Sequence, residues 1–202
     1  MYFSNDFLAN LLFYFIIGYV LYYYFYKKND KLHLKCIISK VDGKEYCVRK
    51  REDLDSAADL LAITIHKLED LVTYLKHNFP NDERTKRISE NFNGTTIKET
   101  LPTSKFKAYS ENKGEALAFC LNTEEQNNTQ LIDDNTLLFV ALHELAHIGT
   151  VSIGHTDEFW DNFKWLLVNA KKAGIHNPSD FKKDPKRYCG MDITDNPYYD
   201  RH

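Results

Sequence analysis

The chain has 202 residues, of which 43% are hydrophobic and 27% charged, and its formal net charge is -3. That length leaves room for one modest globular domain beside any appendage, and the charge argues neither for nor against nucleic acid as a partner. The cysteines form no Cys-x-x-Cys pair and are widely spaced, which excludes a secreted disulfide framework, so we expect free, reduced thiols at Cys36, Cys47, Cys120 and Cys189.

The N-terminal segment is the most apolar part of the chain. Residues 7–26 contain no charged side chain and one amide, that of Asn10. A stretch of about 20 apolar residues is long enough to cross a bilayer as a helix. A signal peptide is disfavoured, since no basic residue precedes the stretch and no small-residue cleavage site follows it. We therefore predict a transmembrane anchor over residues 1–26.

The residues that follow this stretch suggest an orientation. Lys27, Lys28, Lys31 and Lys35 lie directly after it, whereas nothing basic lies before it. By the positive-inside rule, the remainder of the chain would face the cytosol. We expect residues 27–35 to be a charged linker in a single-pass membrane protein whose C-terminal catalytic domain is cytosolic.

The next hundred residues contain a hairpin signal and a long helix signal. An Asp-Gly pair at Asp42 lies between two β-type runs and predicts a β-hairpin. Leucines and alanines recur at helical spacing over residues 54–79, and Pro80 ends that pattern. Residues 81–105 are polar and predict loops and short extended pieces, with a weak helix at 83–91.

Two apolar runs precede a polar loop and a third helix. Residues 106–110 and 114–121 are expected to be strands, and residues 122–130 a loop. The apolar run that starts at Leu137 then predicts a helix, capped by Asp133, Asp134 or Asn135.

This helix contains the motif His143-Glu144-x-x-His147. Residues four apart lie on one face of an α-helix, so both imidazoles can bind the same ion. Two histidines at this spacing suit Zn²⁺, and Glu144 lies beside them as a general base for a water molecule on the metal.

A catalytic zinc usually has a third protein ligand, and His155 is the best candidate. Gly149 and Gly154 can end the metal helix and turn the chain back. His155 then precedes a second helix, 157–167, with Thr156 as its N-cap. The acids at the start of that helix compete with His155. These rivals are Asp157 and Glu158, and we prefer to assign them as first-turn acids favoured by the helix dipole. Asp157 or Asp161 can accept a hydrogen bond from the spare ring nitrogens of the ligands.

The C-terminal region gives weaker signals. Gly174 and Pro178 break the chain, and basic residues over 171–187 alternate with acids, which favours a solvated surface over a phosphate-binding one. The run 188–191 can lie under the metal or fill the core. Three tyrosines remain open as candidates to donate a hydrogen bond to a substrate carbonyl beside the metal, and they are Tyr109, Tyr188 and Tyr198.

The motif and the residues after it resemble a known family. The pattern His-Glu-x-x-His followed by Gly-His-x-x-Glu-Phe-Trp, from His143 to Trp160, is similar to the zincin metallopeptidases of the SprT-like and WLM groups. The match covers mainly residues 135–173, and the gap of seven residues between His147 and His155 is longer than the five of metzincins. A wider and weaker resemblance links the chain to uncharacterised zincin-like proteins of large DNA viruses.

The resemblance implies an α+β fold. The expected zincin-like metallopeptidase domain covers residues 36–202 and has a small mixed sheet, a long N-terminal helix, the metal helix and a following helix, preceded by one transmembrane helix. The resemblance also implies that a strand at about 115–121 forms the upper edge of the sheet, where an extended substrate would pair. A buried strand inside the sheet is the equal alternative for this segment.

We therefore predict a membrane-anchored zinc metallopeptidase. His143, His147 and His155 bind Zn²⁺, and Glu144 serves as general base and then general acid in peptide-bond hydrolysis by a zinc-activated water. The partners are a protein or peptide substrate and a membrane, with nucleic acid disfavoured. Two alternatives stay open: a catalytically silent, zinc-braced binding module at a membrane, and a SprT- or WLM-like protease that acts on nucleic-acid-associated proteins.

Overall fold

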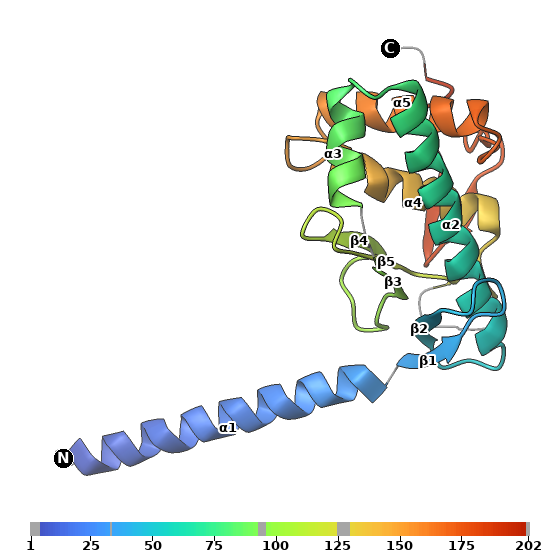
Figure 1. Cartoon of the computed structure of the whole chain (residues 1–202). Coiled ribbons are helices and arrows are strands. Elements are labelled where there is room, and N and C mark those ends of the chain that lie inside the picture. The colour runs from blue at the N-terminus through green and yellow to red at the C-terminus, as the bar shows by residue number, and fades with distance from the viewer. Residues whose placement is uncertain (1–4, 33, 93–95, 125–129, 201–202) are drawn as a thin grey trace.

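The computed structural model describes residues 5–32, 34–92, 96–124 and 130–200. Figure 1 shows a body of helices and small sheets from which one N-terminal helix projects. This is an α+β architecture, as the sequence predicts. In chain order the elements are α1(Asn5–Leu32), β1(Leu34–Ile38), β2(Glu45–Arg49), α2(Leu54–Asn78), α3(Glu83–Asn91), β3(Thr96–Glu99), β4(Ala108–Glu111), β5(Ala116–Phe119), α4(Asp134–Gly149), α5(Asp157–Lys172), β6(Lys186–Tyr188) and β7(Met191–Ile193).

Helix α1 corrects the membrane prediction. It contains the apolar stretch 7–26, yet within the described ranges no helix combines the length and apolarity needed to cross a membrane. The prediction of a single-pass membrane protein with a cytosolic domain is therefore wrong.

The charged residues after the apolar stretch also differ from expectation. Helix α1 continues through them to Leu32, and β1 begins at Leu34. The segment 27–35, expected as a linker, is thus mostly the last two turns of α1.

Strands β1 and β2 form the predicted antiparallel hairpin. The Ser39 backbone N–H donates to the Lys44 carbonyl (2.9 Å), and the Gly43 N–H donates to the Ser39 carbonyl (3.0 Å). Gly43 has φ of +72°, a left-handed conformation that glycine adopts without steric cost. The Asp-Gly signal therefore located the turn correctly.

The cysteines are paired, contrary to the prediction of free thiols. Cys36 and Cys47 lie opposite each other in the hairpin and form a disulfide. A second disulfide joins Cys120 to Cys189, 69 residues apart in sequence with Cα atoms 6.0 Å apart. All four cysteines belong to the described part of the chain, and none is free. Strand register and a long-range contact create these pairs, and neither is visible in the spacing along the sequence.

The central sheet is small and mixed, with the strand order β3-β5-β4. Strand β5 pairs parallel with β3 and antiparallel with β4, and all four of its residues are buried. The expectation that the strand at 115–121 forms the sheet edge is therefore wrong. A completely apolar strand of this kind belongs in the middle of a sheet, and the edge nearest the metal helix is β4.

Helix α4 lies in the middle of the body and packs on α2, α3, α5 and β4 (Figure 1). Its apolar side chains face these neighbours on nearly every side, so α4 is buried over most of its length. Helix α2 begins after the N-cap Asp53 and covers one side of α4 with the leucines of its predicted apolar stripe. This burial fixes α4 as a rigid element on which a site can be built.

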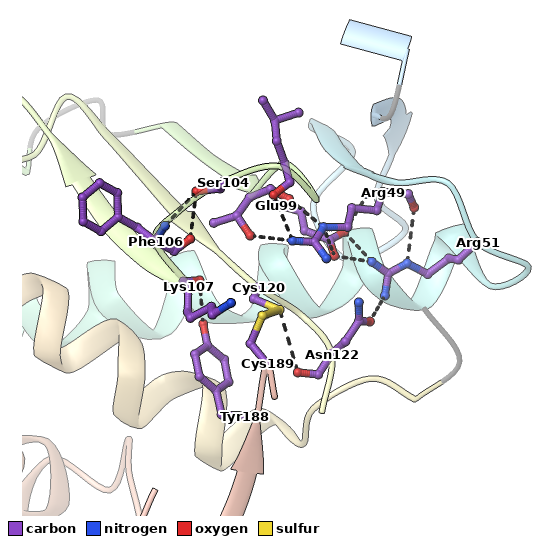
Figure 2. A network of polar contacts seen from close by, with 12 residues as sticks. Arg49, Arg51, Glu99, Ser104, Phe106, Lys107, Cys120, Asn122, Tyr188 and Cys189 are labelled. Carbon is purple, nitrogen blue, oxygen red and sulfur yellow. Dashed lines mark hydrogen bonds and ion pairs between the residues drawn. A yellow bond between two sulfur atoms is a disulfide. The ribbon is translucent and has the colours of Figure 1, made fainter. Parts of the chain in front are cut away.

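A buried polar network joins the hairpin to the sheet, as Figure 2 shows. The Glu99 carboxylate accepts from the Arg49 backbone N–H (2.7 Å) and forms an ion pair with Arg51. Arg51 also donates to the Asn122 side chain (2.7 Å). Burial raises the pKa of Glu99, and the two guanidinium groups oppose that rise. The network ties β2 and β3 to residue 122, directly beyond the Cys120 disulfide.

The C-terminal region contains a short hairpin, β6–β7, that the sequence did not reveal. After it, residues 194–200 form a segment held against the body. The Asn196 side chain donates to the Ser179 carbonyl (2.9 Å), and the Tyr199 hydroxyl donates to the Pro178 carbonyl (2.7 Å). Basic residues of this region pair with acids, which agrees with the expected solvated surface; the pairs are Lys182–Asp195, Lys183–Asp180, Lys186–Asp184 and Arg187–Asp192.

Candidate metal centre

Helix α4 is fixed at both ends. Asp133 is its N-cap, and its side chain accepts from the Thr136 backbone N–H (2.9 Å). At the other end, Arg87 Nε donates to the Gly149 carbonyl (2.8 Å), and the Thr150 hydroxyl donates to the Ala146 carbonyl (2.7 Å). These bonds satisfy groups that a helix terminus would otherwise leave unpaired. The last two turns, which carry the histidines, are thereby held in place.

The loop after α4 turns the chain back over the helix. Gly154 has φ of +87°, which permits the turn. The Glu158 carboxylate accepts from the backbone N–H groups of Val151 and Ser152, both at 3.0 Å, and these bonds lower the pKa of Glu158 to about 2. Thr156 is the N-cap of α5, as predicted, and accepts from the Phe159 N–H (3.4 Å). Glu158 is therefore the clamp of this loop.

The three predicted histidines come together at one point. The ring centroids of His143, His147 and His155 are 4.9 to 5.0 Å apart in every pairing. One nitrogen of each ring lies within 4.8 Å of the others, and the Nε2 atoms of His143 and His155 are 3.0 Å apart. Tetrahedral nitrogen ligands on Zn²⁺ stand about 3.3 Å apart, so the group has the dimensions of a metal site.

The protonation of these rings also suits a metal. Burial, together with the neighbouring histidines His147 and His155, lowers the pKa of His143 to about 3. Burial, together with His155, lowers the pKa of His147 to about 4. Both rings are therefore neutral at pH 7 and carry the lone pair that a metal ligand needs.

Phe159 forms the floor beneath the three rings. Its centroid lies 4.3 Å from that of His147, 4.8 Å from that of His143 and 4.7 Å from that of His155, and the side chain is fully buried. Trp160 lies beside His155, with centroids 5.7 Å apart. These contacts give the Phe-Trp pair of the sequence motif a physical role, because they fix the orientation of the imidazoles.

Glu144 is buried beside the histidines, with 6% of its surface exposed. Burial raises the pKa of its carboxyl group to about 7. A carboxyl group with this pKa can both accept and donate a proton near neutral pH. Glu144 also lines a cavity that reaches His143 and His155.

This cavity has a volume of about 620 Å³ and two walls of different origin. Helices α4 and α5 form one wall, and residues 105–108 together with side chains of the region 188–200 form the other. A smaller hollow of about 150 Å³ lies on the His147 side and is bordered by Ser110 and Lys113. Strand β4 runs past both, since its first residue, Ala108, lines the cavity and Ser110 lines the hollow.

The remaining predicted site residues are placed as follows. Asp157 and Asp161 make no hydrogen bond to the three rings within the part of the chain that is described. Of the three tyrosines, Tyr188 lines the cavity, while its hydroxyl donates to the Lys107 carbonyl (3.2 Å); Tyr109 and Tyr198 do not line it.

Sequence reasoning missed most of the second wall. Residues 105–108 were predicted to be the end of a loop and the start of a strand, and within 194–200 the sequence suggested a site role only for Tyr198, which does not line the cavity. The run 188–191 was the one signal that indicated it, since Tyr188 and Met191 both line the cavity.

Comparison with known proteins gives relatives without established function. No family model matches the chain. An uncharacterized protein of Acanthamoeba polyphaga mimivirus is 29% identical over 184 residues, covering 89% of this chain and 92% of that protein. An uncharacterized protein of Invertebrate iridescent virus 6 is 34% identical over 83 residues, 41% of this chain and 45% of that protein. The chain thus has viral relatives, as the sequence resemblance predicted.

Among solved structures, the chain is similar to Wss1 from Saccharomyces cerevisiae. That crystal structure superimposes with a TM-score of 0.46 at 18% identity, covering 61% of this chain and 84% of the other. A Wss1 mutant from the same organism gives a TM-score of 0.48 at 16% identity, covering 63% and 87%. Likeness at this level leaves the function to be argued from the site itself.

Proposed function

We propose that this protein is a zinc-dependent peptidase. One observation supports the proposal above all others: three histidine rings converge on one point, and a buried glutamate lies beside them at a cavity. His143, His147 and His155 would hold the ion. Glu144 would be the general base and acid of the reaction.

The number of ligands favours a catalytic role over a structural one. Structural zinc sites usually have four protein ligands, whereas catalytic sites have three and leave one position open. The described residues bring three His, Cys, Asp or Glu donors to this point. Bound Zn²⁺ would polarise a peptide carbonyl and lower the pKa of a water molecule.

Glu144 would carry the proton through the reaction. It takes one proton from the attacking water while the water oxygen forms a bond to the carbonyl carbon. It then donates this proton to the amide nitrogen as the C–N bond breaks, which leaves a carboxylic acid and an amine. The burial that raises the pKa of Glu144 to about 7 suits both transfers.

Strand β4 offers a place for a protein or peptide substrate. It is an edge strand of the sheet and passes both the cavity and the smaller hollow. An edge strand has unpaired backbone groups, and an extended peptide can pair with them. A substrate bound in this way would cross the metal site with its scissile bond near Glu144.

Replacement of Glu144 by Gln tests the proposal. The amide keeps the shape of the side chain but cannot accept the proton, so hydrolysis of casein should fall by roughly 10²- to 10⁴-fold while zinc stays bound. A chelator should abolish the activity of the unchanged protein, and added zinc should restore it. Full activity in Glu144→Gln would refute the mechanism. Bound zinc without hydrolysis in the unchanged protein would instead support the silent binding module.

A role on nucleic-acid-associated proteins has less support. The basic residues over 182–187 are engaged in ion pairs with nearby acids, and this lowers the positive charge available to a phosphate backbone. DNA-stimulated cleavage with a steep salt dependence is the result that would favour this role.

A further inference from the structure

We infer that the cavity of about 620 Å³ beside Glu144 binds a large apolar side chain of the substrate, the one on the residue that carries the leaving nitrogen. The inference rests on the proposed peptidase function and adds a substrate preference to it.

The cavity has an apolar lining contributed by three elements. Phe139 and Val140 come from α4, Phe163 from α5, and Met191 and Ile193 from β7. Apolar side chains that enter such a site are removed from water, and this favours binding in proportion to the area buried. The volume is within the range of about 300–1,000 Å³ typical of small-molecule pockets, so an aromatic or large aliphatic side chain fits inside.

The acids at the rim are engaged with lysines. Asp195 forms an ion pair with Lys182 (3.1 Å), and the Asp200 carboxylate bonds to the same lysine. Lys164 donates to the Asp200 backbone carbonyl. These acids are therefore occupied, while Lys105 and Lys107 also line the cavity and add positive charge to its wall. A charged substrate side chain would still lose its hydration against the apolar part of the lining, which is costly.

The position of Glu144 decides which substrate residue enters the cavity. Glu144 lines the cavity and does not line the smaller hollow. Since Glu144 must reach the leaving nitrogen, the residue that carries this nitrogen lies on the cavity side of the metal site. The residue before the scissile bond then lies toward the hollow of about 150 Å³.

A set of four peptides tests this preference. The peptides differ only in the residue after the scissile bond, which is Phe, Leu, Ala or Asp, and the full chain loaded with zinc is used. We expect kcat/KM to be higher for Phe and Leu than for Ala by roughly 10- to 100-fold, and higher for Phe and Leu than for Asp. Binding of the same peptides to Glu144→Gln, measured by calorimetry, should follow the same order.

Filling the cavity should remove the preference. Ile193 is half-buried in the lining, and Ile193→Trp should lower kcat/KM for the Phe and Leu peptides more than for the Ala peptide. The matched control is Ile38→Trp, on β1, where the side chain is 67% exposed and outside the cavity. If Ile193→Trp does not fold, Met191→Trp takes its place, because Met191 is 49% exposed and lines the same cavity.

The outcomes separate the pocket from the peptidase. Equal cleavage of all four peptides would overturn the apolar pocket and leave the proposed hydrolysis intact. Failure to cleave any peptide or casein would overturn the hydrolysis, and the order of binding to Glu144→Gln would still decide the pocket. An unchanged preference in the cavity-filling variant would also overturn the assignment.

Discussion

The two walls of the cavity beside Glu144 are built in different ways. The wall with the histidines is local, because α4, the loop after it and α5 are consecutive in the chain. The opposite wall combines residues 105–108 with side chains of 188–200, about 80 residues further along. A disulfide, Cys120–Cys189, and a hydrogen bond from Tyr188 to Lys107 hold that wall together (Figure 2).

The two walls would therefore have different roles, with the chemistry on the local wall and substrate selectivity on the non-local wall. The local wall contains the metal ligands and Glu144, which any substrate would need. The non-local wall contributes much of the apolar lining, which would discriminate between substrates. We therefore expect damage to the first wall to abolish activity, and damage to the second to change preference and stability while zinc stays bound.

The largest effect should follow from removing a ligand in the local wall. His143→Ala or His147→Ala leaves two ligands, so zinc affinity should fall by more than the roughly 10- to 100-fold typical of losing an outer-shell partner. Hydrolysis should fall to background. Metal analysis after dialysis measures the first effect and casein cleavage the second. His77→Ala, on an exposed face of α2, is the control and should keep both. Normal zinc content in both ligand variants would show that the histidines do not form the site.

The disulfide of the non-local wall should have the next largest effect. Replacing Cys120 and Cys189 by Ser removes a link across 69 residues, and we expect a loss of about 2–4 kcal/mol in the free energy of unfolding. Urea unfolding checks this, and zinc content should stay unchanged. The pair Cys36 and Cys47 is the control, because its shorter separation of 11 residues lies in the hairpin away from the cavity. A loss of zinc in the first variant would contradict the separation of the two walls.

The local wall could be predicted from the sequence, whereas most of the non-local wall could not. His143 and His147 follow from helical periodicity, and His155 lies eight residues further on, so local pattern was sufficient to propose all three. The hairpin at Asp42 and the long helix α2 were likewise local signals.

The rest depends on contacts between distant segments. The β3–β5 pairing, the Cys120–Cys189 disulfide and the segment 194–200 each join residues far apart, and the sequence gives no register for them. The membrane prediction rested on composition alone, and among the described residues no helix has the length and apolarity that a membrane span requires.

A buried histidine behind the local wall predicts a pH dependence of stability, with a smaller effect than the changes above. His176 is 4% exposed, neither ring nitrogen has a hydrogen-bond partner among the described residues, and its ring lies near Phe139 of the cavity lining. Burial, together with Lys67, lowers the pKa of His176 to about 4. The folded state therefore binds the proton more weakly than the unfolded state. The stability that the neutral His176 ring contributes to the folded state is fully present above pH 6.5 and is lost as the pH falls toward 4.

The variant His176→Leu should remove this pH dependence. Between pH 7 and pH 4.5, the unchanged protein should lose about 2–3 kcal/mol more in the free energy of unfolding than the variant. Urea titrations at the two pH values measure the difference. An exposed histidine serves as the comparison, and His77→Leu should follow the unchanged protein. Equal losses in the unchanged protein and His176→Leu would show that His176 is not the group responsible.

The smallest effect should come from the clamp of the loop. Glu158→Gln weakens the bonds to the Val151 and Ser152 N–H groups, and the loop that carries His155 becomes less ordered. We expect zinc affinity to fall by about 10-fold, in the range for groups that orient a ligand. Competition with a chromogenic chelator measures the affinity. An unchanged affinity would mean that the loop keeps His155 in place without this clamp.

Zinc affinity of His155→Ala, compared with Asp157→Ala, tests the central claim most directly. His155 is the ligand that the local wall supplies from outside the helix, and Asp157 is its nearest acidic rival in sequence. We predict that His155→Ala loses zinc and hydrolytic activity, and that Asp157→Ala keeps both. Full zinc affinity in His155→Ala, together with its loss in Asp157→Ala, would contradict the three-histidine site.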